Sequence, residues 1–336
     1  CALVASSTPA LLSAISNGAR HGMLFKGGAY LEELAEIRSI AFDKTGTLTK
    51  GEFSVTDEYW AEDEAVILPY VLGLEGKSTH PLAQGIVKKW GQAYQSLDLV
   101  TEEITASGIQ AVEGDRTYYV GKKRGTYEEP EALAEWKHQG KTVIYVERDH
   151  QFVGGIGLLD TLNKNAQESV AYFNHAGIQT VMLTGDNRHT AQTVAQGAGI
   201  KEYYGELLPE DKVKYVQQLK EKYGKNAMVG DGVNDAPALA TATIGIAMGE
   251  GTDVAMDVAD VVIMENNLAK LVYTHRLSQK MKRIIKQNII FSVAVILSLI
   301  ALNLMQSLTI PLAVIGHEGS TILVILNGLR LLREEK

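Results

Sequence analysis

Short apolar runs alternate with polar loops through most of the chain, and long apolar runs close it. Residues 37–42 have the pattern of a buried strand, and runs 180–183 and 227–229 resemble it. Helix-like stretches lie between these runs, for example at 188–198 and from residue 208 onward. Strands that alternate with helices predict an α/β domain with parallel strands.

The pattern changes between residues 51 and 152. Two helical stretches, 62–74 and 81–94, precede short alternating runs at 117–120 and 142–146. Alternation of this kind predicts an antiparallel sheet. This region is therefore predicted to be an α+β insertion between the first strand of the α/β domain and its remaining units.

The carboxyl-terminal region predicts a membrane hairpin. An uncharged run extends from residue 288 to 316, a turn is expected at 306–311, and a second apolar stretch follows. Positive residues flank the pair on both sides, which predicts that both ends are cytoplasmic. Those residues are Lys280, Lys282, Arg283, Lys286, Arg330, Arg333 and Lys336. Buried helices of a soluble protein are the alternative.

The amino-terminal residues 1–16 carry no charge. This run is too short to span a bilayer, and Pro9 is expected to interrupt a helix. The chain begins without methionine inside a hydrophobic run, so we expect residues 1–20 to be part of a transmembrane helix of a longer polypeptide. A buried soluble helix is the alternative. Residues 18–34 have a charged, helical spacing and predict an amphipathic exit toward the first strand.

Charge and cysteine content narrow the class of protein. The formal net charge is −8, which argues against a nucleic-acid-binding surface. The only cysteine, Cys1, excludes an internal disulfide and fits a largely cytosolic protein. A further acidic cluster is expected to be a solvated surface; its members are Asp253, Asp257 and Asp260.

Candidate chemistry begins at Asp43, which follows the strand at 37–42. The carboxyl ends of parallel strands are where open α/β sheets bind ligands. A carboxylate with a pKa of about 3.9 is ionised at pH 7 and needs no base to act as a nucleophile. Two unit charges about 3.5 Å apart repel by roughly 5 kcal/mol at an effective dielectric near 20. Attack on a phosphate therefore requires nearby cations.

The heptapeptide at 43–49, Asp-Lys-Thr-Gly-Thr-Leu-Thr, resembles the phosphorylation motif of the P-type ATPases. The resemblance implies that Asp43 takes the γ-phosphoryl group of ATP, with Lys44 and Thr45 beside it. Haloacid-dehalogenase-type phosphatases, the soluble relatives of that family, usually carry a second aspartate two positions on. Thr45 stands there instead, and a site without that proton carrier is expected to hold its phosphoryl group longer.

A second stretch, 230–239, resembles the hinge and Mg²⁺ motif of the same family. The implied Mg²⁺ ligands are Asp43, the carbonyl of Thr45 and Asp231, and Mg²⁺ prefers such oxygen donors. Asn234 and Asp235 are expected to orient water and phosphate.

Two further segments are expected at the phosphate. Thr184 and Gly185 stand where a hydroxyl and a backbone N–H can bind phosphate oxygens, and Asp186 follows them. Lys212 resembles the family's phosphate-contacting lysine. Taken alone, a lysine in a helix is nearly always solvated.

The inserted region carries a match to the heavy-metal branch of the family. Glu75, Ser78, His80 and Pro81 resemble its nucleotide-domain motif, whose residues hold the adenosine part of ATP. Pro81 suits the first position of a helix, with His80 at the capping end. A solvated helix start is the alternative.

The companion glycine motif of that branch is only partly present. Gly108 and Gly121 match, whereas Ala106 occupies the first glycine position and Lys122 replaces an asparagine. These departures imply that the nucleotide is bound differently or more weakly. Gly108 alone is also compatible with a turn.

The second apolar stretch contains a polar run, residues 317–321. A carboxylate at mid-membrane costs roughly 2.5–3.5 kcal/mol, so Glu318 is a functional candidate. The run resembles the last-span motif of the cobalt, iron and zinc exporting subgroup, which implies a transported-ion site of Cys1, His317, Glu318 and Thr321. Mixed sulfur, nitrogen and oxygen donors suit Zn²⁺, Co²⁺ or Fe²⁺ over Cu⁺. Pairing of His317 with Glu318 is the structural alternative.

These patterns together predict a haloacid-dehalogenase-like Rossmannoid phosphorylation domain with an inserted α+β nucleotide-binding domain and carboxyl-terminal transmembrane helices. The expected domains are a partial transmembrane helix (1–20), the phosphorylation domain (21–51 and 153–279), the nucleotide-binding domain (52–152) and two transmembrane helices (280–336).

The implied function is ATP-driven export of a divalent transition metal, Co, Fe or Zn, through an aspartyl-phosphate. The implied cofactors are ATP and Mg²⁺. The implied setting is the cell membrane with cytoplasmic catalytic domains, and the partners are the bilayer and upstream actuator and membrane segments. Two alternatives remain: a soluble phosphatase, disfavoured by Thr45 and by the hairpin, and a nucleotide-binding fragment without turnover of its own.

Overall fold

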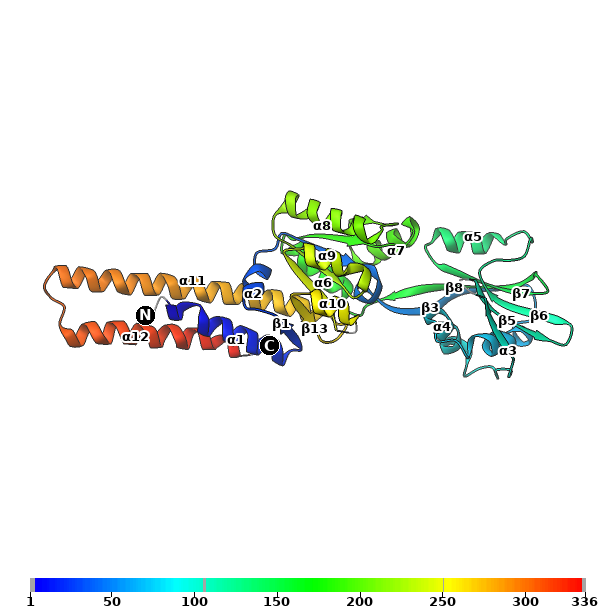
Figure 1. Ribbon diagram of the computed structural model, residues 1–336, viewed down its shortest axis with the longest axis horizontal. Coiled ribbons are helices and arrows are strands. Elements are labelled where there is room, and N and C mark those ends of the chain that lie inside the picture. The colour runs from blue at the N-terminus through cyan, green and yellow to red at the C-terminus, as the bar shows by residue number, and fades with distance from the viewer. Residues whose placement is uncertain (1–3, 105–106, 250, 334–336) are drawn as a thin grey trace.

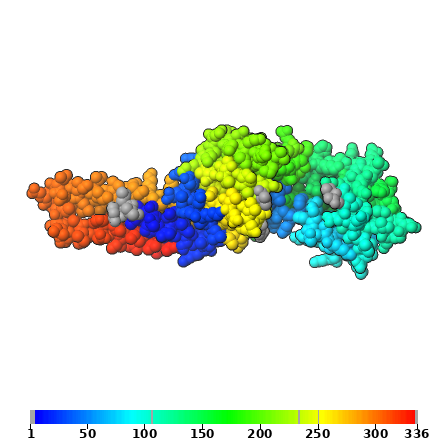
Figure 2. All heavy atoms as spheres, in the orientation of Figure 1, coloured from blue at the N-terminus to red at the C-terminus, as the bar shows by residue number. Residues whose placement is uncertain are grey.

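The computed structural model describes residues 4–104, 107–249 and 251–333. Cys1 and Ala106 lie outside these ranges. The described chain is elongated: a group of long helices, a central α/β domain and a distal α+β domain follow one another along its axis (Figure 1). The space-filling view shows the same three parts as one continuous surface (Figure 2).

The α/β domain is built on a seven-stranded sheet whose strand order is β1-β13-β12-β11-β2-β9-β10. All neighbouring strands are parallel except β1, which pairs antiparallel with β13. In this order the strands are Met23–Phe25, Val261–Ile263, Ile244–Met248, Asn226–Gly230, Ser39–Asp43, Gln179–Leu183 and Glu202–Tyr204. Because β11, β2 and β9 are parallel neighbours, their carboxyl ends meet at one edge.

Helices cover both faces of this sheet. Alternate residues of β2 divide between two cores: Ile40 and Phe42 lie in one, and Ala41 lies in the other. The first core includes α6 (Ala166–His175), α7 (Arg188–Ala198) and the start of α11 (Leu268–Leu304). The second includes α8 (Pro209–Tyr223), α9 (Ala236–Thr241) and α10 (Asp253–Val258).

The distal domain is a six-stranded antiparallel sheet in the order β3-β8-β7-β6-β5-β4. In this order the strands are Thr49–Trp60, Gln151–Leu162, Thr142–Arg148, Arg116–Gly121, Gly108–Glu113 and Thr101–Ile104. The long strands β3 and β8 form the ribbon that joins the two domains (Figure 1). The antiparallel sheet confirms the α+β insertion predicted from the alternating pattern.

Helices also cover both faces of the distal sheet. Ile144 and Val146 of β7 pack with α3 (Glu64–Glu75) and α4 (Pro81–Trp90), whereas Tyr145 packs with α5 (Glu131–His138). Successive residues of a strand point to opposite faces. Therefore α5 lies on the face opposite to α3 and α4, as Figure 1 shows.

The long helices are α1 (Thr8–Arg20), α11 and α12 (Ile310–Leu329), with α2 (Ala29–Leu34) beside them. Of the described helices, α11 and α12 are long and apolar enough to cross a membrane. The boundary expected at residue 280 lies inside α11, which begins at Leu268 and runs unbroken for 37 residues. Where the short turn before α1 meets α11 and α12, the buried Asn288 amide donates to the carbonyls of Ser6 and Val324.

Some local expectations are wrong. Pro9 does not interrupt a helix; it lies in the first turn of α1, where its missing N–H has no partner to lose. The stretch 18–34 is not one amphipathic helix, because α1 ends at Arg20 and the short strand β1 intervenes before α2. Asp260 is not simply solvated, because its carboxylate accepts the Gly245 N–H at 2.9 Å.

Candidate active site

The turn after β2 fixes the position of Asp43. This aspartate is the last residue of the strand, and the Thr45 N–H donates to its Oδ2 at 2.9 Å. The chain then turns sharply through Lys44–Leu48, a segment in which Gly46 has φ +65°. A residue with a β-carbon is strained in that conformation, so glycine permits the turn.

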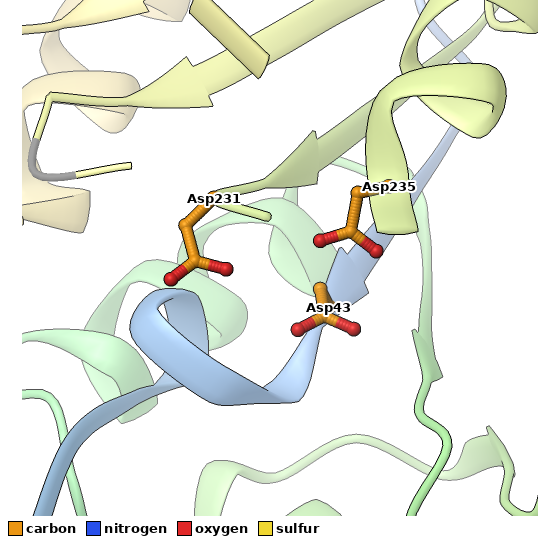
Figure 3. Close-up of side chains that lie close together, drawn as sticks. All are labelled: Asp43, Asp231 and Asp235. Carbon is orange, nitrogen blue, oxygen red and sulfur yellow. The ribbon is translucent and has the colours of Figure 1, made fainter. Parts of the chain in front are cut away.

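Three carboxylates meet at this edge of the sheet. Asp43 ends β2, Asp231 follows β11, and Asp235 ends the short turn before α9. Each offers one oxygen within 4.8 Å of the others, and Figure 3 shows the three side chains converging. Asp43 and Asp235 are buried, and Asp231 is partly buried. The neighbouring Asn234 is exposed.

Lys212 joins two of these carboxylates. It lies in the first turn of α8, and its Nζ is 2.5 Å from Asp43 Oδ1 and 2.6 Å from Asp235 Oδ1. The side chain is only 8% exposed, so the ammonium is not the solvated group that a lysine in a helix usually is. The structure thus brings Lys212 to the position that the resemblance implied.

The single positive charge of Lys212 does not neutralise the three carboxylates. Burial and the charge of Asp235 raise the pKa of Asp43 to about 7, although Lys212 opposes the shift. Burial and Asp235 likewise raise the pKa of Asp231 to about 6. The charged form of Asp43, which was expected from the sequence, is therefore disfavoured by burial and by Asp235 and favoured by Lys212. A divalent cation between these oxygens favours their charged forms.

Lys44 points to a different pair of acids. Its Nζ is 2.6 Å from Asp186 Oδ2 and 3.6 Å from Asp160 Oδ2. Asp160 also accepts the Thr49 hydroxyl at 2.6 Å, and burial raises its pKa. Sequence reasoning missed Asp160, and its only signal was an acidic residue that closes the apolar run of β8.

The segment 184–187 follows β9 and reaches the same edge. The Asp186 N–H donates to the Thr184 hydroxyl at 3.1 Å, and Asp186 is held by Lys44 as described above. Thr184 is buried and Gly185 is exposed. The carboxyl ends of β2, β9 and β11 thus carry all the residues expected at the phosphate except Lys212, which α8 supplies.

The expected nucleotide residues lie in the distal domain. Pro81 begins α4, and the His80 ring accepts the Leu82 N–H at 3.2 Å through Nδ1. The Ser78 hydroxyl in turn accepts the His80 N–H at 3.2 Å. Glu75 is buried at the end of α3, and burial raises its pKa to about 7. His80 therefore has a capping role in addition to the role that the resemblance implies.

Two contacts orient α4 relative to the α/β domain. Gly85 lies against the Phe53 carbonyl, and Trp90 meets Trp60 at a ring-centroid distance of 5.9 Å. Because β3 leaves the α/β domain at Thr49, α4 runs along β3 with its amino end toward that domain. His80 therefore lies at the end of the distal domain that faces Asp43.

Close packing between two strands requires glycine at positions 108 and 121. Gly108 and Gly121 are cross-strand partners in β5 and β6. A β-carbon on Gly108 would lie 2.2 Å from the Val120 carbonyl, and one on Gly121 would lie 2.4 Å from the Ser107 carbonyl. The alternative interpretation of Gly108 as a turn is wrong, because this residue begins a strand.

The expected transported-ion residues are only partly described. Cys1 lies outside the described residues. His317 and Glu318 are exposed on α12, and the Ser320 and Thr321 hydroxyls donate to the His317 carbonyl at 2.7 and 3.0 Å.

Comparison with known proteins identifies the class. Residues 37–243 match the family model of the haloacid dehalogenase-like hydrolases. The chain is 50% identical to a zinc-transporting ATPase of Bacillus subtilis, over 99% of this chain and 54% of that protein. It is 40% identical to a zinc/cadmium/lead-transporting P-type ATPase of Escherichia coli, over 99% of this chain and 46% of that protein. The chain thus spans about half the length of these curated relatives.

Solved structures of metal-transporting ATPases are also similar to this chain. A crystal structure of a zinc-transporting PIB-type ATPase in an E2.Pi state matches with a TM-score of 0.89 and 38% identity, covering 99% of this chain and 56% of that one. A catalytic domain of a CPx-ATPase matches with a TM-score of 0.60 and 30% identity, covering 78% of this chain and 98% of that one.

The chain belongs to the haloacid dehalogenase-like hydrolases. Within them it is a member of the heavy-metal-transporting, CPx-type branch of the P-type ATPases, which confirms the family and fold predicted from the sequence. Membership places the chain in a membrane, with the α/β and α+β domains on the cytoplasmic side.

Proposed function

We propose that this chain carries out phosphoryl transfer from ATP to Asp43 in an ATPase that exports a metal cation. The convergence of Asp43, Asp231, Asp235 and Lys212 at one sheet edge carries this proposal. An Asp43 oxygen attacks the γ-phosphorus, the bond to the bridging oxygen breaks, and ADP leaves with that oxygen. The proposed phosphorylation domain comprises residues 21–51 and 153–279, and the proposed nucleotide-binding domain comprises 52–152.

The donor set fits a magnesium ion. Carboxylate oxygens of Asp43 and Asp231 and the carbonyl of Thr45 are the hard ligands that Mg²⁺ prefers. The raised pKa values of both aspartates fit a site short of positive charge. When bound, Mg²⁺ neutralises charge on the phosphoryl group and its attacking carboxylate.

The remaining side chains orient the reactants. The Lys212 ammonium pairs with the Asp43 carboxylate at the carboxyl edge of the sheet. The same ammonium is placed to contact a transferred phosphoryl group. Thr184 and Gly185 offer a hydroxyl and an N–H for its oxygens. Asn234 and Asp235 position phosphate and water. Thr45 supplies no acid, so the aspartyl-phosphate is expected to be long-lived, and a soluble phosphatase is not favoured.

The nucleotide is proposed to bind at the end of the distal domain that faces Asp43. Its adenosine part is held by the buried carboxyl of Glu75, the ring of His80 and the close-packed glycine pair Gly108 and Gly121, with Ser78 and Pro81 shaping the start of α4.

The test of this proposal is Asp43→Asn in the full-length membrane protein. The variant keeps the shape and removes the nucleophile, so no acid-stable, hydroxylamine-labile phosphoenzyme is expected from ATP. Asp253→Asn, which changes an exposed aspartate on α10, is the matched control and should label normally. Full labelling of the Asp43 variant would refute the assignment.

For the transported ion we propose a divalent metal held by Cys1, His317, Glu318 and Thr321. The names of the relatives point to zinc or cadmium, while the polar run of α12 resembles the cobalt, iron and zinc exporting subgroup. A thiolate and a carboxylate together offset a 2+ charge, and mixed donors suit Zn²⁺, Co²⁺ and Fe²⁺.

The ion is tested by metal-stimulated ATPase activity of the full-length protein. Stimulation by Zn²⁺, Co²⁺ or Fe²⁺ is expected, and Glu318→Gln or His317→Ala should abolish it while phosphorylation by inorganic phosphate continues. Ser307→Ala, in the loop before α12, is the control. Stimulation by Cu⁺ alone, or an unchanged divalent response in both variants, contradicts this site.

A further inference from the structure

Beside the β3–β8 ribbon, the two cytoplasmic domains also touch where α5 ends. The Thr190 hydroxyl of α7 donates to the Gly140 carbonyl at 3.1 Å. The Thr193 hydroxyl lies 2.9 Å from the Gln139 carbonyl, its nearer acceptor, and 3.1 Å from the His189 carbonyl of its own helix. We call this set the α5–α7 contact: Gln139, Gly140, Thr190, Thr193 and the edge-to-face rings of His138 and His189, whose centroids are 5.6 Å apart.

Gly140 makes this contact close. It is buried and has φ +77°, and a β-carbon there would lie 2.8 Å from the Thr193 hydroxyl oxygen and 2.9 Å from the His189 carbonyl oxygen. Only a glycine lets the end of α5 approach α7 so nearly. Figure 1 shows these two helices meeting on one side of the ribbon.

The nucleotide end of the distal domain lies on the other side. α4 and α5 cover opposite faces of the distal sheet, and the amino end of α4 faces the α/β domain. The pairing of β3 with β8 is irregular between Thr49 and Phe53, where the ribbon leaves the α/β domain. A bend at that irregularity that moves α4 toward Asp43 therefore lifts α5 away from α7.

The α7 side of the α5–α7 contact is connected to the proposed phosphorylation site. α7 starts directly after the segment 184–187, and Asp186 in that segment pairs with Lys44, the neighbour of Asp43. The Asn187 side chain caps α7 by accepting the Thr190 N–H, and the Thr190 hydroxyl donates to the distal domain. The α5–α7 contact thus connects the distal domain to the segment in which Asp186 pairs with Lys44.

We propose that the α5–α7 contact is a releasable brace that holds the nucleotide-binding domain away from Asp43 and limits how often bound ATP reaches it. This inference rests on the proposed function, in which Asp43 takes its phosphoryl group from ATP. Thr190 and Thr193 are then positioning residues for the transfer. Two neutral hydrogen bonds correspond to roughly a tenfold shift between braced and released arrangements.

The kinetic test uses the full-length protein with Thr190→Val and Thr193→Val combined. Single-turnover phosphorylation at limiting ATP should be about three- to tenfold faster, while phosphorylation by inorganic phosphate stays unchanged because it needs only the α/β domain. The pair Thr190→Ser and Thr193→Ser keeps both hydroxyls and should behave as the wild type. Slower or unchanged phosphorylation by ATP in the valine variant overturns the brace.

A distance measurement tests the contact without relying on activity. Spin labels on cysteines introduced at the exposed positions Glu131 of α5 and Gln192 of α7, with every other cysteine of the full-length protein replaced by serine, should give one narrow distance distribution without the valine substitutions and a broader, longer one with them. An equally narrow distribution in the valine variant refutes the proposal. Absence of any phosphoenzyme in the wild type counts against the proposed function alone.

Discussion

Gly46 lies so close to Asp231 that a β-carbon on it would fall 1.6 Å from the Asp231 Oδ2. The turn after Asp43 and the loop after β11 are therefore packed against each other at the backbone of one glycine. This contact sets the spacing between Asp43, the proposed nucleophile, and Asp231, a proposed Mg²⁺ ligand.

Gly46→Ala is expected to lower phosphorylation by ATP at least 100-fold, because either the turn or the Asp231 carboxylate must move. Gly51→Ala is the matched control: residue 51 has nearly the same positive φ, +68°, but nothing lies within 4 Å of its β-carbon position. Gly51→Ala therefore introduces only the backbone strain of a β-carbon at positive φ, which costs about 1 kcal/mol. Equal loss in both variants would show that backbone strain, not the contact with Asp231, is responsible.

Lys212→Met should destabilise the protein as well as abolish phosphorylation. Removing the ammonium leaves Asp43 and Asp235 as unpaired buried carboxylates, a change that costs about 3–5 kcal/mol. Thermal unfolding of the detergent-solubilised protein measures this, with the exposed Lys214→Met as control. Adding Asp43→Asn to Lys212→Met should restore part of the lost stability, and no restoration would contradict the charge argument.

His80 combines a cap with a proposed nucleotide contact, and two substitutions separate them. Asparagine caps helices well, so His80→Asn should keep α4 intact while removing the ring. Both His80→Asn and His80→Ala are expected to weaken phosphorylation by ATP and to spare phosphorylation by inorganic phosphate. Normal ATP dependence in the asparagine variant would show that only the cap matters.

Glu75 predicts a pH-dependent stability. Its pKa is raised from 4.5 to about 7 by burial, so the unfolded chain releases this proton at lower pH than the folded one. Stability should therefore fall as pH rises from about 4.5 to 7, by roughly 3 kcal/mol from this group. Glu75→Gln should be more stable than the wild type at pH 8 and similar at pH 4.5. The exposed Glu103→Gln is the control, and equal pH profiles for all three proteins would contradict this origin.

The sequence predicted the parts of the site that follow buried strands. Asp43 and Asp231 end apolar runs, and parallel pairing then brings them together without further information. Lys212 could be placed only by resemblance, because its first turn of α8 has an ordinary polar composition. Asp160 escaped because its partner Lys44 lies far away along the chain, and pairing across that separation leaves no local pattern.

Parts of the fold that lack a clear local sequence pattern were also missed. The three-residue strand β1 is too short to have a recognisable period, so residues 18–34 read as one helix. The start of α11 was missed because its first turns mix apolar residues with Lys270 and Arg276, and they pack on the α/β domain instead of continuing the uncharged run. The α5–α7 contact uses threonine hydroxyls and backbone carbonyls, which no sequence pattern marks.

The unbroken helix α11 connects the α/β domain to the apolar helix pair. The helix contains neither proline nor glycine, the residues at which helices most often kink. Its first turns are buried in the α/β domain, and farther along Gln279 bonds the Ala35 carbonyl and Lys282 pairs with Glu36. At 1.5 Å per residue it is about 55 Å long, so a tilt of about 5° at the domain displaces its far end by roughly 5 Å. We therefore expect a movement of the α/β domain to shift the far end of α11, which lies beside the proposed ion-site helix α12, with no change in the internal structure of α11.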